Sequence, residues 1–399
     1  MDALKEKIKS LSSRFLPEII ANRRHIHANP ELSFEEFNTS NFIASKLKDY
    51  NISFKQGMVK TGIVALIEGK NPSVRVIALR ADMDALPITE KNNCDYKSKN
   101  EGLMHACGHD VHSASLLGVA RILSELKGEF EGTIKLIFQP GEEKLPGGAS
   151  LMIKAGVLES PAPQSIFGQH VFPSMEVGKV GFRTGMYMAS TDELYLIVRG
   201  KGGHAAMVNE YVNPLLISAE IMAELNALFL SHEQKIPTVL AFGKITGNGA
   251  TNVIPDEVKI EGTFRTMNEK WREEAHKLMK TTAEKIAKVM GGSIEFRIER
   301  GYPFLVNDKT ITEKAKAAAS EYLGKENVEE LPLRMTAEDF AFYSQQIPAC
   351  FYRLGTGNKA KGITAGVHTA MFDIDEQALE IGVGLMAWLA LNELQNESN

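Results

Sequence analysis

Strand-like and helix-like segments alternate in the first half of the chain, and this alternation constrains the fold more than any other feature. Residues 74–79 (VRVIAL) and 133–138 (TIKLIF) are short apolar runs, and residues 111–126 between them carry apolar side chains at helical spacing. Residues 165–171 (SIFGQHV) form another strand-like piece. A strand, a helix and a strand in this order favour right-handed βαβ units. The pattern predicts an α/β fold in which helices cover a mixed, mostly parallel sheet.

The middle of the chain has a different pattern. Residues 193–198, 238–245 and 257–264 alternate in the manner of antiparallel strands, and two amphipathic helices are predicted at 213–230 and 269–290. Gly291 and Gly292 follow the second helix, where a C-cap is expected. We therefore expect an inserted α+β domain over residues 185–297. The other domain would consist of residues 1–184 and 298–399.

Composition narrows the class of protein. The 399 residues are 44% hydrophobic and 24% charged, as in globular proteins and unlike disordered ones. The net charge of −5 argues against binding to nucleic acid, and no apolar run approaches the length of a membrane span. The N-terminal residues predict an amphipathic helix and not a signal peptide. Three cysteines are too few for a disulfide framework, so we expect a cytoplasmic protein.

Polar side chains follow the predicted strands. Asp82 and Asp84 come after the first strand, Glu142 and Glu143 come after the strand at 133–138, and His170 lies near the end of the strand at 165–171. In open α/β sheets, ligands bind at the carboxyl ends of the strands. We therefore expect a functional site where these side chains meet.

Several segments carry side chains that bind metals. Residues 104–112 (MHACGHDVH) contain three histidines, one cysteine and one aspartate, which are ligand types for zinc or a manganese-like ion. A polar loop with Asp110 capping the next helix would give the same pattern. Of the pair Glu142 and Glu143, one could bind a metal while the other holds a water, although a solvated surface pair is also possible. His204 and His368 lie in glycine-rich stretches that also fit ordinary turns.

Taken together, these segments resemble the amidohydrolase branch of the two-metal aminoacylase/carboxypeptidase family. That branch includes hippurate hydrolases, N-acyl-amino-acid amidohydrolases and plant auxin-conjugate hydrolases. The resemblance begins at residues 25–32 (HIHANPEL) and reaches the C-terminal helix. Its most specific pieces are DMDALP at 82–87, HACGHD at 105–110, FQP at 138–140 with the two glutamates, and EDF at 338–340.

The resemblance implies two divalent metal ions, zinc or manganese, with cobalt or nickel as further options. The five implied metal ligands are Cys107, His109, Glu143, His170 and His368. Cys107 stands where other branches use a bridging carboxylate, so it would bridge the ions as a thiolate. The implied catalytic and substrate-binding residues are Glu142 as general base, His204 of a lid domain at the oxyanion, Asp84 orienting a ligand, and Asn252 and Arg265 near the substrate carboxylate.

The implied reaction is hydrolysis of the amide bond of an N-acyl amino acid by a metal-activated water, which releases a carboxylic acid and a free amino acid. The partner would be this small molecule or a short peptide. Residues 185–297 would form a lid and dimerisation domain, and a lid histidine acting across an interface would require a homodimer.

Three alternatives stay open at this point. A metallo-carboxypeptidase or dipeptidase would cleave a peptide bond by the same mechanism. A thiol hydrolase would use Cys107 as nucleophile with His109 or His170, but it leaves Glu142, Glu143 and His368 without a role. A binding protein with a relic site would not be expected to keep every ligand and the base.

The other histidines are not predicted to bind metal directly. Two of them, two residues apart in the first helix, are expected to be structural: His25 and His27. Two lie near the start of the predicted helix of residues 111–126 and could support the ligands: His105 and His112. Two are expected on the surface of the insertion's helices: His232 and His276.

Overall fold

The structure is a computed structural model in which residues 1–230 and 236–395 are described. These residues form two compact units. Unit 1 contains Met1–Tyr187, Val306–Pro332 and the chain from Asp339 onward, and unit 2 contains Met188–Leu305 and Leu333–Glu338. The inserted domain expected at residues 185–297 stays a prediction.

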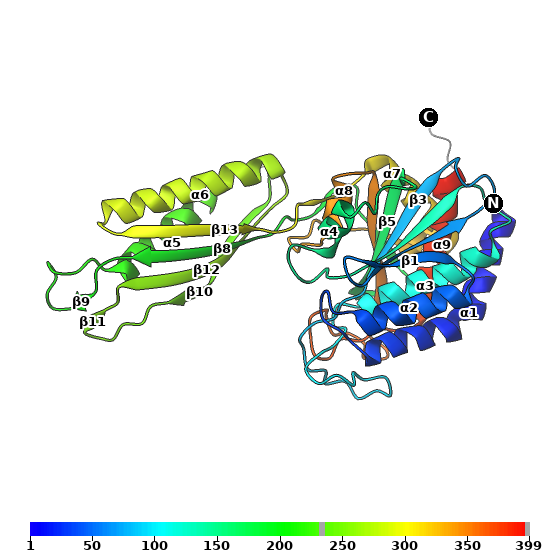
Figure 1. The fold of residues 1–399 in the computed structure, drawn as a ribbon, viewed down its shortest axis with the longest axis horizontal. Helices are drawn as coiled ribbons and strands as arrows, with labels where there is room; N and C mark the ends of the chain where they lie inside the picture. Colours follow the sequence, from blue (N-terminus) through cyan, green and yellow to red (C-terminus); the bar gives the residue numbers. More distant parts are fainter. Residues whose placement is uncertain (231–235, 396–399) are drawn as a thin grey trace. The chain divides into compact units, whose positions relative to one another are not determined.

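Unit 1 is built on one eight-stranded sheet (Figure 1). In sheet order, its strands are β1 (Ser53–Met58), β2 (Gly62–Glu68), β4 (Thr133–Gln139), β3 (Val76–Asp82), β5 (Ser165–Glu176), β16 (Ala349–Gly357), β6 (Val180–Phe182) and β15 (Val328–Glu330). β3 runs parallel to β4 and β5, β5 to β16, and β6 to β15. The remaining pairs are antiparallel: β1 with β2, β2 with β4, and β6 with β16. The predicted α/β fold with a mixed, mostly parallel sheet is confirmed.

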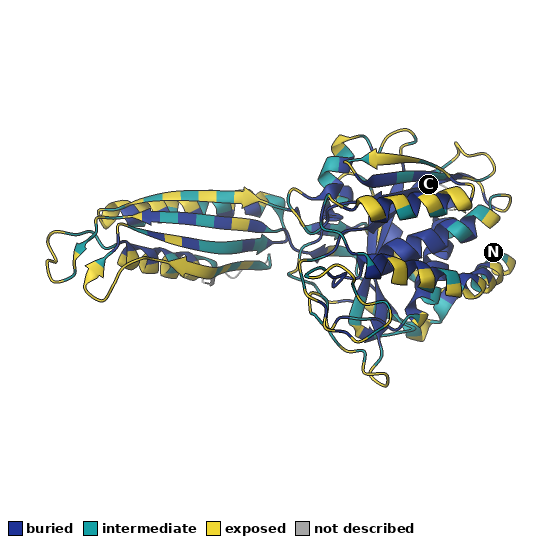
Figure 2. Cartoon of the chain, turned by 60° about the horizontal axis from the view of Figure 1, so that its bottom comes forward, coloured by how far each residue is buried: buried dark blue, intermediate teal, exposed yellow. Residues whose placement is uncertain are grey.

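Helices cover this sheet. They are α1 (Asp2–Ala28), α2 (Phe37–Asp49), α3 (His109–Glu125), α4 (Gly148–Lys154), α7 (Lys309–Leu323), α8 (Ala341–Ser344) and α9 (Gln377–Gln395), with a short 3-10 helix at Lys325–Asn327. α3 contacts α1, α9 and β3, and it is buried over most of its length (Figure 2). Every residue of β3 and β4 is also buried, which is typical of strands covered on both faces. Within the described residues, no helix is both long and apolar enough to cross a membrane.

The strand that carries His170 is longer than expected. β5 continues to Glu176, so His170 lies inside the strand and not near its end. The reason is the neighbouring strand β16, whose residues Leu354, Gly355 and Gly357 continue the parallel pairing beyond His170. The sequence alone could not show that a strand from the end of the chain would extend β5.

Unit 2 has a four-stranded antiparallel sheet. Its order is β10 (Thr238–Thr246), β12 (Glu257–Thr266), β8 (Asp192–Arg199) and β13 (Ser293–Arg300). The two helices that contact it are α5 (Pro214–Leu230) and α6 (Glu269–Val289). Two shorter pairings lie outside this sheet: β9 (Gly203–His204) with β11 (Val253–Ile254), and β7 (Gly185–Met188) with β14 (Leu305–Asn307), whose residues belong mostly to unit 1. α6 begins where the Asn268 side chain accepts a hydrogen bond from the Trp271 amide.

His276 was expected on the surface, and that prediction is wrong. Its side chain is 14% exposed, and its Nε2 lies 2.7 Å from Oδ2 of the buried Asp192. Arg272 donates to the same carboxylate. Burial alone would raise the pKa of Asp192, but the hydrogen bonds from His276 and Arg272 outweigh burial and lower it. The other histidine predicted on the surface, His232, lies outside the described residues.

Candidate metal centre and active site

The start of α3 places two of the expected ligands. Cys107 precedes the helix, and His109 is its first residue. Gly108 between them has a φ of +87°, and a Cβ there would lie 2.6 Å from a methyl group of Val171. A side chain at position 108 would therefore be strained and would collide with the strand that carries His170.

Buried ionic groups of α1 hold this end of α3. Arg23 Nε lies 2.7 Å and His27 Nδ1 lies 2.8 Å from Oδ2 of Asp110, the second residue of α3. His27 Nε2 lies 3.2 Å from Glu90 Oε1. Burial alone would raise the pKa of Asp110, but Arg23 and His27 lower it well below its usual value. Asp110 thus tethers α3 to α1.

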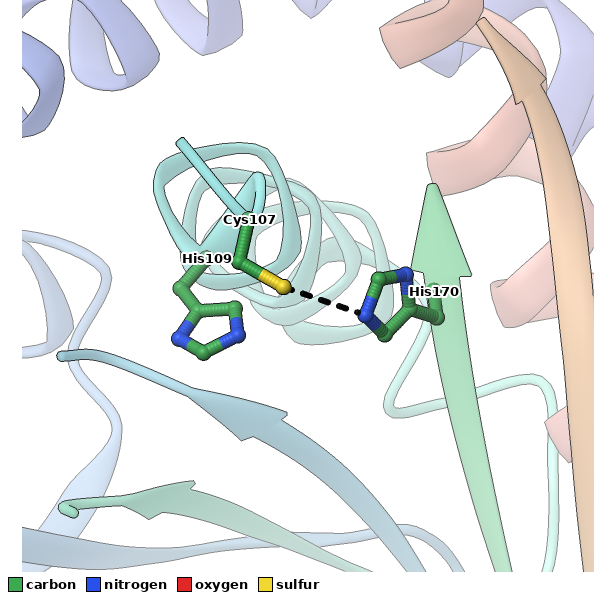
Figure 3. A group of neighbouring side chains, drawn as sticks. All are labelled: Cys107, His109 and His170. Carbon is green, nitrogen blue, oxygen red and sulfur yellow. Dashed lines mark hydrogen bonds between the residues drawn. The ribbon is translucent and has the colours of Figure 1, made fainter. Parts of the chain in front are cut away.

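The Cys107 sulfur lies at the centre of the site. Its Sγ is 3.6 Å from Nε2 of His170 on β5 and 3.3 Å from Nε2 of His368. Figure 3 shows the sulfur pointing toward His170 with the His109 ring beside it. His368 has a φ of 61°, and its amide donates to the Ala106 carbonyl at 2.7 Å, which holds its loop against the segment before α3.

Two of the groups of side chains that could hold a cation share Cys107. One consists of Cys107, His109 and His170, and the other of Cys107, Glu143 and His368. Within each group the ligand atoms all lie within 4.8 Å of one another. The structure thus brings all five expected ligands together, and Cys107 belongs to both groups.

Hydrogen bonds orient the imidazole rings for metal binding. His170 Nδ1 lies 2.8 Å from the Val171 carbonyl oxygen, and His109 Nδ1 lies 2.8 Å from the Asp84 carbonyl oxygen. Each Nδ1–H can donate to its carbonyl, so each Nε2 keeps a lone pair on the side of Cys107. His109 Nε2 is buried and has no hydrogen bond among the described residues. A cation would satisfy this nitrogen.

Protons and a cation compete for two of the expected ligands. Burial raises the pKa of the Cys107 thiol. Burial alone would lower the pKa of His109, but the negative charge of Asp82 raises it well above its usual value. Both groups therefore favour a bound proton in the metal-free protein, and a divalent ion would displace these protons. A thiolate, three imidazoles and a carboxylate suit zinc and the neighbouring transition metals.

Asp84 holds the turn that carries the two glutamates. Its Oδ1 accepts from the Glu142 amide at 3.0 Å, and its Oδ2 accepts from the Glu143 amide at 2.9 Å and from the Ser33 hydroxyl at 2.6 Å. Its Oδ1 also lies 3.2 Å from His109 Nδ1. Burial would raise the pKa of Asp84, but these hydrogen bonds, with His109 first, lower it. Asp84 therefore contacts both the turn and one of the expected ligands.

The two glutamate side chains diverge. Glu143 Oε1 lies 3.2 Å from His368 Nε2 and 4.0 Å from His109 Nε2. Glu142 is only 6% exposed, and its Oε1 accepts from the Asp339 amide at 3.3 Å. The Glu143 carboxylate thus faces two other candidate ligands, His368 and His109. The Glu142 carboxylate lies beside them in a buried position suited to moving a proton.

Sequence reasoning missed a buried network behind this site. Arg80 donates to Asp82 at 2.6 Å, to Gln139 at 2.9 Å and to Asp339 at 2.7 Å. Gln139 and Asp339 stand inside the motifs that carried the resemblance, which was the one signal for them. Arg80 gave no signal beyond its place next to the aspartates.

His112 supports His170 through the backbone. Its Nδ1 lies 2.6 Å from Asp82 Oδ1, and its Nε2 accepts from the Val171 amide at 3.0 Å. The same Val171 residue provides the carbonyl that binds His170 Nδ1. The chain Asp82–His112–Val171 thus fixes the backbone that orients a candidate ligand.

The other predicted site residues lie in unit 2. The exposed His204 is in β9 and pairs with Val253 of β11. The Asn252 carbonyl accepts from the Ala205 amide at 3.0 Å, so His204 and Asn252 belong to one small ribbon. Arg265 lies on β12 opposite Val239 of β10, in the four-stranded sheet and not in that ribbon. Burial lowers the pKa of Arg265.

A family model places the chain among known proteins. The model of Peptidase family M20/M25/M40 matches residues 78–392. The chain belongs to this family. The resemblance drawn from the sequence motifs is confirmed, and with it the assignment to the metal-dependent hydrolases.

Members of the M20 family are similar in sequence to this chain over nearly its whole length. N-acetylcysteine deacetylase of Bacillus subtilis is 37% identical over 96% of this chain and 98% of its own. Thermostable carboxypeptidase 2 of Saccharolobus solfataricus is 37% identical over 97% of this chain and 98% of its own. The crystal structure of the Bacillus subtilis YXEP protein, a dinuclear metal binding peptidase from the M20 family, superposes with a TM-score of 0.84 at 34% identity and covers 96% of this chain and 99% of that one.

Proposed function

We propose that this M20 protein hydrolyses the amide bond of N-acyl amino acids and releases a carboxylic acid and a free amino acid. The observation that carries the proposal is the pair of donor groups that share Cys107, with the buried carboxylate of Glu142 beside them. Similarity to a deacetylase that is named for an N-acetyl amino acid supports this substrate class.

We propose two divalent ions, zinc or manganese, held by Cys107, His109, Glu143, His170 and His368. When bound, such ions polarise a carbonyl oxygen and lower the pKa of water. The mixed sulfur, nitrogen and oxygen donors favour zinc, and cobalt or nickel would also fit.

Glu142 is the proposed general base. Its carboxylate takes a proton from the attacking water and returns a proton to the departing amine. Its buried position beside the Asp339 amide keeps bulk water from competing for that proton. Asp84 keeps the Glu142 backbone and the His109 ring in place.

Unit 2 would supply the substrate contacts. His204 is proposed to stabilise the oxyanion that forms on the amide carbonyl. Asn252 and Arg265 are proposed to bind the carboxylate of the substrate, for which the forked guanidinium of Arg265 is well suited. The exposed His204 can serve this role in a partner's site, so we propose a homodimer, and an active monomer in light scattering would contradict it. The three cysteines are free, which agrees with the proposed cytoplasmic location.

Peptide cleavage is the second candidate. The same water attack would split a dipeptide or remove a C-terminal residue, and a relative of equal identity is named a carboxypeptidase. The two functions differ only in the acyl side of the scissile bond.

The test is a hydrolysis panel. Purified protein is assayed with N-acetyl, N-benzoyl and N-succinyl amino acids and with several dipeptides, each with chelator and with added Mn²⁺ or Zn²⁺. We expect chelator-sensitive release of free amino acid from at least one N-acyl substrate. Release from dipeptides alone would favour peptide cleavage as the function. Turnover that resists the chelator would refute the metal-dependent mechanism.

A further inference from the structure

The segment of residues 31–36 lies against the turn that carries Glu142 and Glu143. The Glu31 carbonyl accepts from the Ala85 amide at 2.8 Å, next to Asp84. The Ser33 hydroxyl donates to Asp84 Oδ2 at 2.6 Å. This segment includes the end of the HIHANPEL motif, to which the proposed mechanism gives no role.

Glu36 is the residue of this segment that reaches the turn itself. Its Oε1 accepts from the Gly141 amide at 2.8 Å and from the Phe34 amide at 2.9 Å. Its Oε2 accepts from the Thr61 hydroxyl at 2.7 Å. The side chain is fully buried, at 0% exposure. One carboxylate therefore joins three separate segments of unit 1.

Three successive amides of the turn are held by two carboxylates. Glu36 binds the amide of Gly141, and Asp84 binds the amides of Glu142 and Glu143. With all three amides fixed, the peptide planes of the turn cannot rotate. The directions in which the Glu142 and Glu143 side chains leave the backbone are therefore set by these two carboxylates.

Residues 31–36 pack tightly against the turn that carries Glu142 and Glu143. Gly141 has a φ of +62°, and a Cβ at this position would lie 2.4 Å from the Phe34 ring. Phe34 itself has a φ of 66°, which is uncommon for a non-glycine residue. Such a conformation persists where the surroundings enforce it, and here the bond from the Phe34 amide to Glu36 does so.

We propose that Glu36 is a positioning residue of the active site, which acts through the Gly141 amide to aim Glu142 and Glu143. The proposal rests on the proposed function for the roles of these two glutamates. Among the described residues, the hydrogen bonds of the Glu36 side chain go to Gly141, Phe34 and Thr61, none of which is a proposed metal ligand.

Glu36 would position the two glutamates through its hydrogen bonds and not through its charge. Burial and the negative charge of Asp84 raise the pKa of Glu36 to about 7. A protonated Glu36 would donate from Oε2 to the Thr61 hydroxyl oxygen and would still accept both amides at Oε1. Glutamine can make the same set of bonds. Aspartate keeps the charge but is one methylene too short to reach all three partners.

The test compares Glu36→Gln with Glu36→Asp and Glu36→Ala in the full-length protein. Kinetics are measured on the best substrate of the panel, and Mn²⁺ and Zn²⁺ affinities are measured by calorimetry on chelator-treated protein. We expect Glu36→Gln to stay within about 3-fold of wild type, while Glu36→Asp and Glu36→Ala lose roughly 100-fold in kcat with a smaller change in KM, the size expected for a displacement of about 1 Å. The same two variants should bind the metal more weakly, since Glu143 is misdirected.

The matched control is Glu393→Ala. Glu393 is a buried carboxylate of unit 1 that pairs with Arg75 just before β3, whereas Asp82 and Asp84 lie at and beyond the other end of that strand. This variant should lose stability but keep the kcat and metal affinity of folded protein. Wild-type kcat and metal affinity in folded Glu36→Asp, or an equal loss in Glu36→Gln, would overturn the proposal. If wild type cleaves no N-acyl substrate, the proposed function fails, while the metal affinities still decide whether Glu36 sets the turn.

Discussion

Asp84→Asn is the change whose consequence is most directly worked out from the structure. In the native site, each oxygen of Asp84 accepts from one backbone amide, from Glu142 at 3.0 Å and from Glu143 at 2.9 Å. Asparagine replaces one of these acceptors by an NH₂ donor. The better orientation points the NH₂ toward Ser33, whose hydroxyl can reverse and accept, and this leaves the Glu143 amide facing a donor.

The expected cost follows from the groups left without partners. One buried unpaired amide costs about 1–3 kcal/mol, so Asp84→Asn should destabilise unit 1 by that amount. Asp84→Ala leaves both amides unpaired and should cost roughly 2–6 kcal/mol, within the ~5–15 kcal/mol that holds a typical protein folded. Only Asp84→Ala loses the contact of Oδ1 to His109, so this variant should also bind metal about 10–100-fold more weakly.

Urea unfolding of chelator-treated protein measures the stability change. The chain has two tryptophans, and in a Trp271→Phe background the buried Trp388 reports on unit 1 alone. Ser33→Ala serves as the control, because it removes one donor to Asp84 and leaves both amides bonded, so about 1 kcal/mol is expected. An Asp84→Asn protein as stable as wild type, or an Asp84→Ala protein with unchanged metal affinity, would refute this account of the turn.

Two further predictions concern the proposed general base, Glu142, and the stability of unit 2 at low pH. Glu142→Gln should keep its metal, measured by elemental analysis, and lose about 10²–10⁴-fold in kcat; retained turnover in the metal-loaded variant would exclude Glu142 as the base. Asp192 has a lowered pKa in the folded state. Its contribution to stability is therefore complete above the ordinary pKa of 3.8 and is lost as the pH falls through the folded value. Melting temperatures between pH 2 and 6 should fall more steeply for wild type than for Asp192→Asn, and parallel curves would argue against a lowered pKa of Asp192 in the folded protein.

The sequence predicted the fold class well, because its signals are local. Each strand of the βαβ region is a short apolar run, and the helix between them has a clear period. The length of β5 was missed, since its outer part is defined by pairing with β16 from the far end of the chain. His276 was missed for the same kind of reason, because its partner Asp192 is 84 residues away in the chain.

In the candidate site, too, some residues could be predicted from their type and others only from the fold. Residues of ligand type stood out in the sequence, and the structure brings the Cys107 sulfur within 3.6 Å of a ring nitrogen of both His170 and His368. The residues behind them did not stand out. Glu36 looks like any surface glutamate in a sequence, and only the fold shows that it meets Gly141 across 105 residues of chain. A supporting residue is defined by where its partner lies and not by its own type.

Titration of activity against metal tests the central claim most directly. Chelator-treated wild type and Cys107→Ser are reconstituted with zinc or manganese, and the release of amino acid from the best N-acyl substrate is followed as metal equivalents are added. The account predicts that wild-type activity rises until two equivalents are bound per chain. Cys107→Ser, which lacks the thiolate shared by both donor groups, should bind fewer than two equivalents tightly and show little activity. Full activity in metal-free wild type, or two tightly bound ions in Cys107→Ser, would contradict a two-metal site that depends on Cys107.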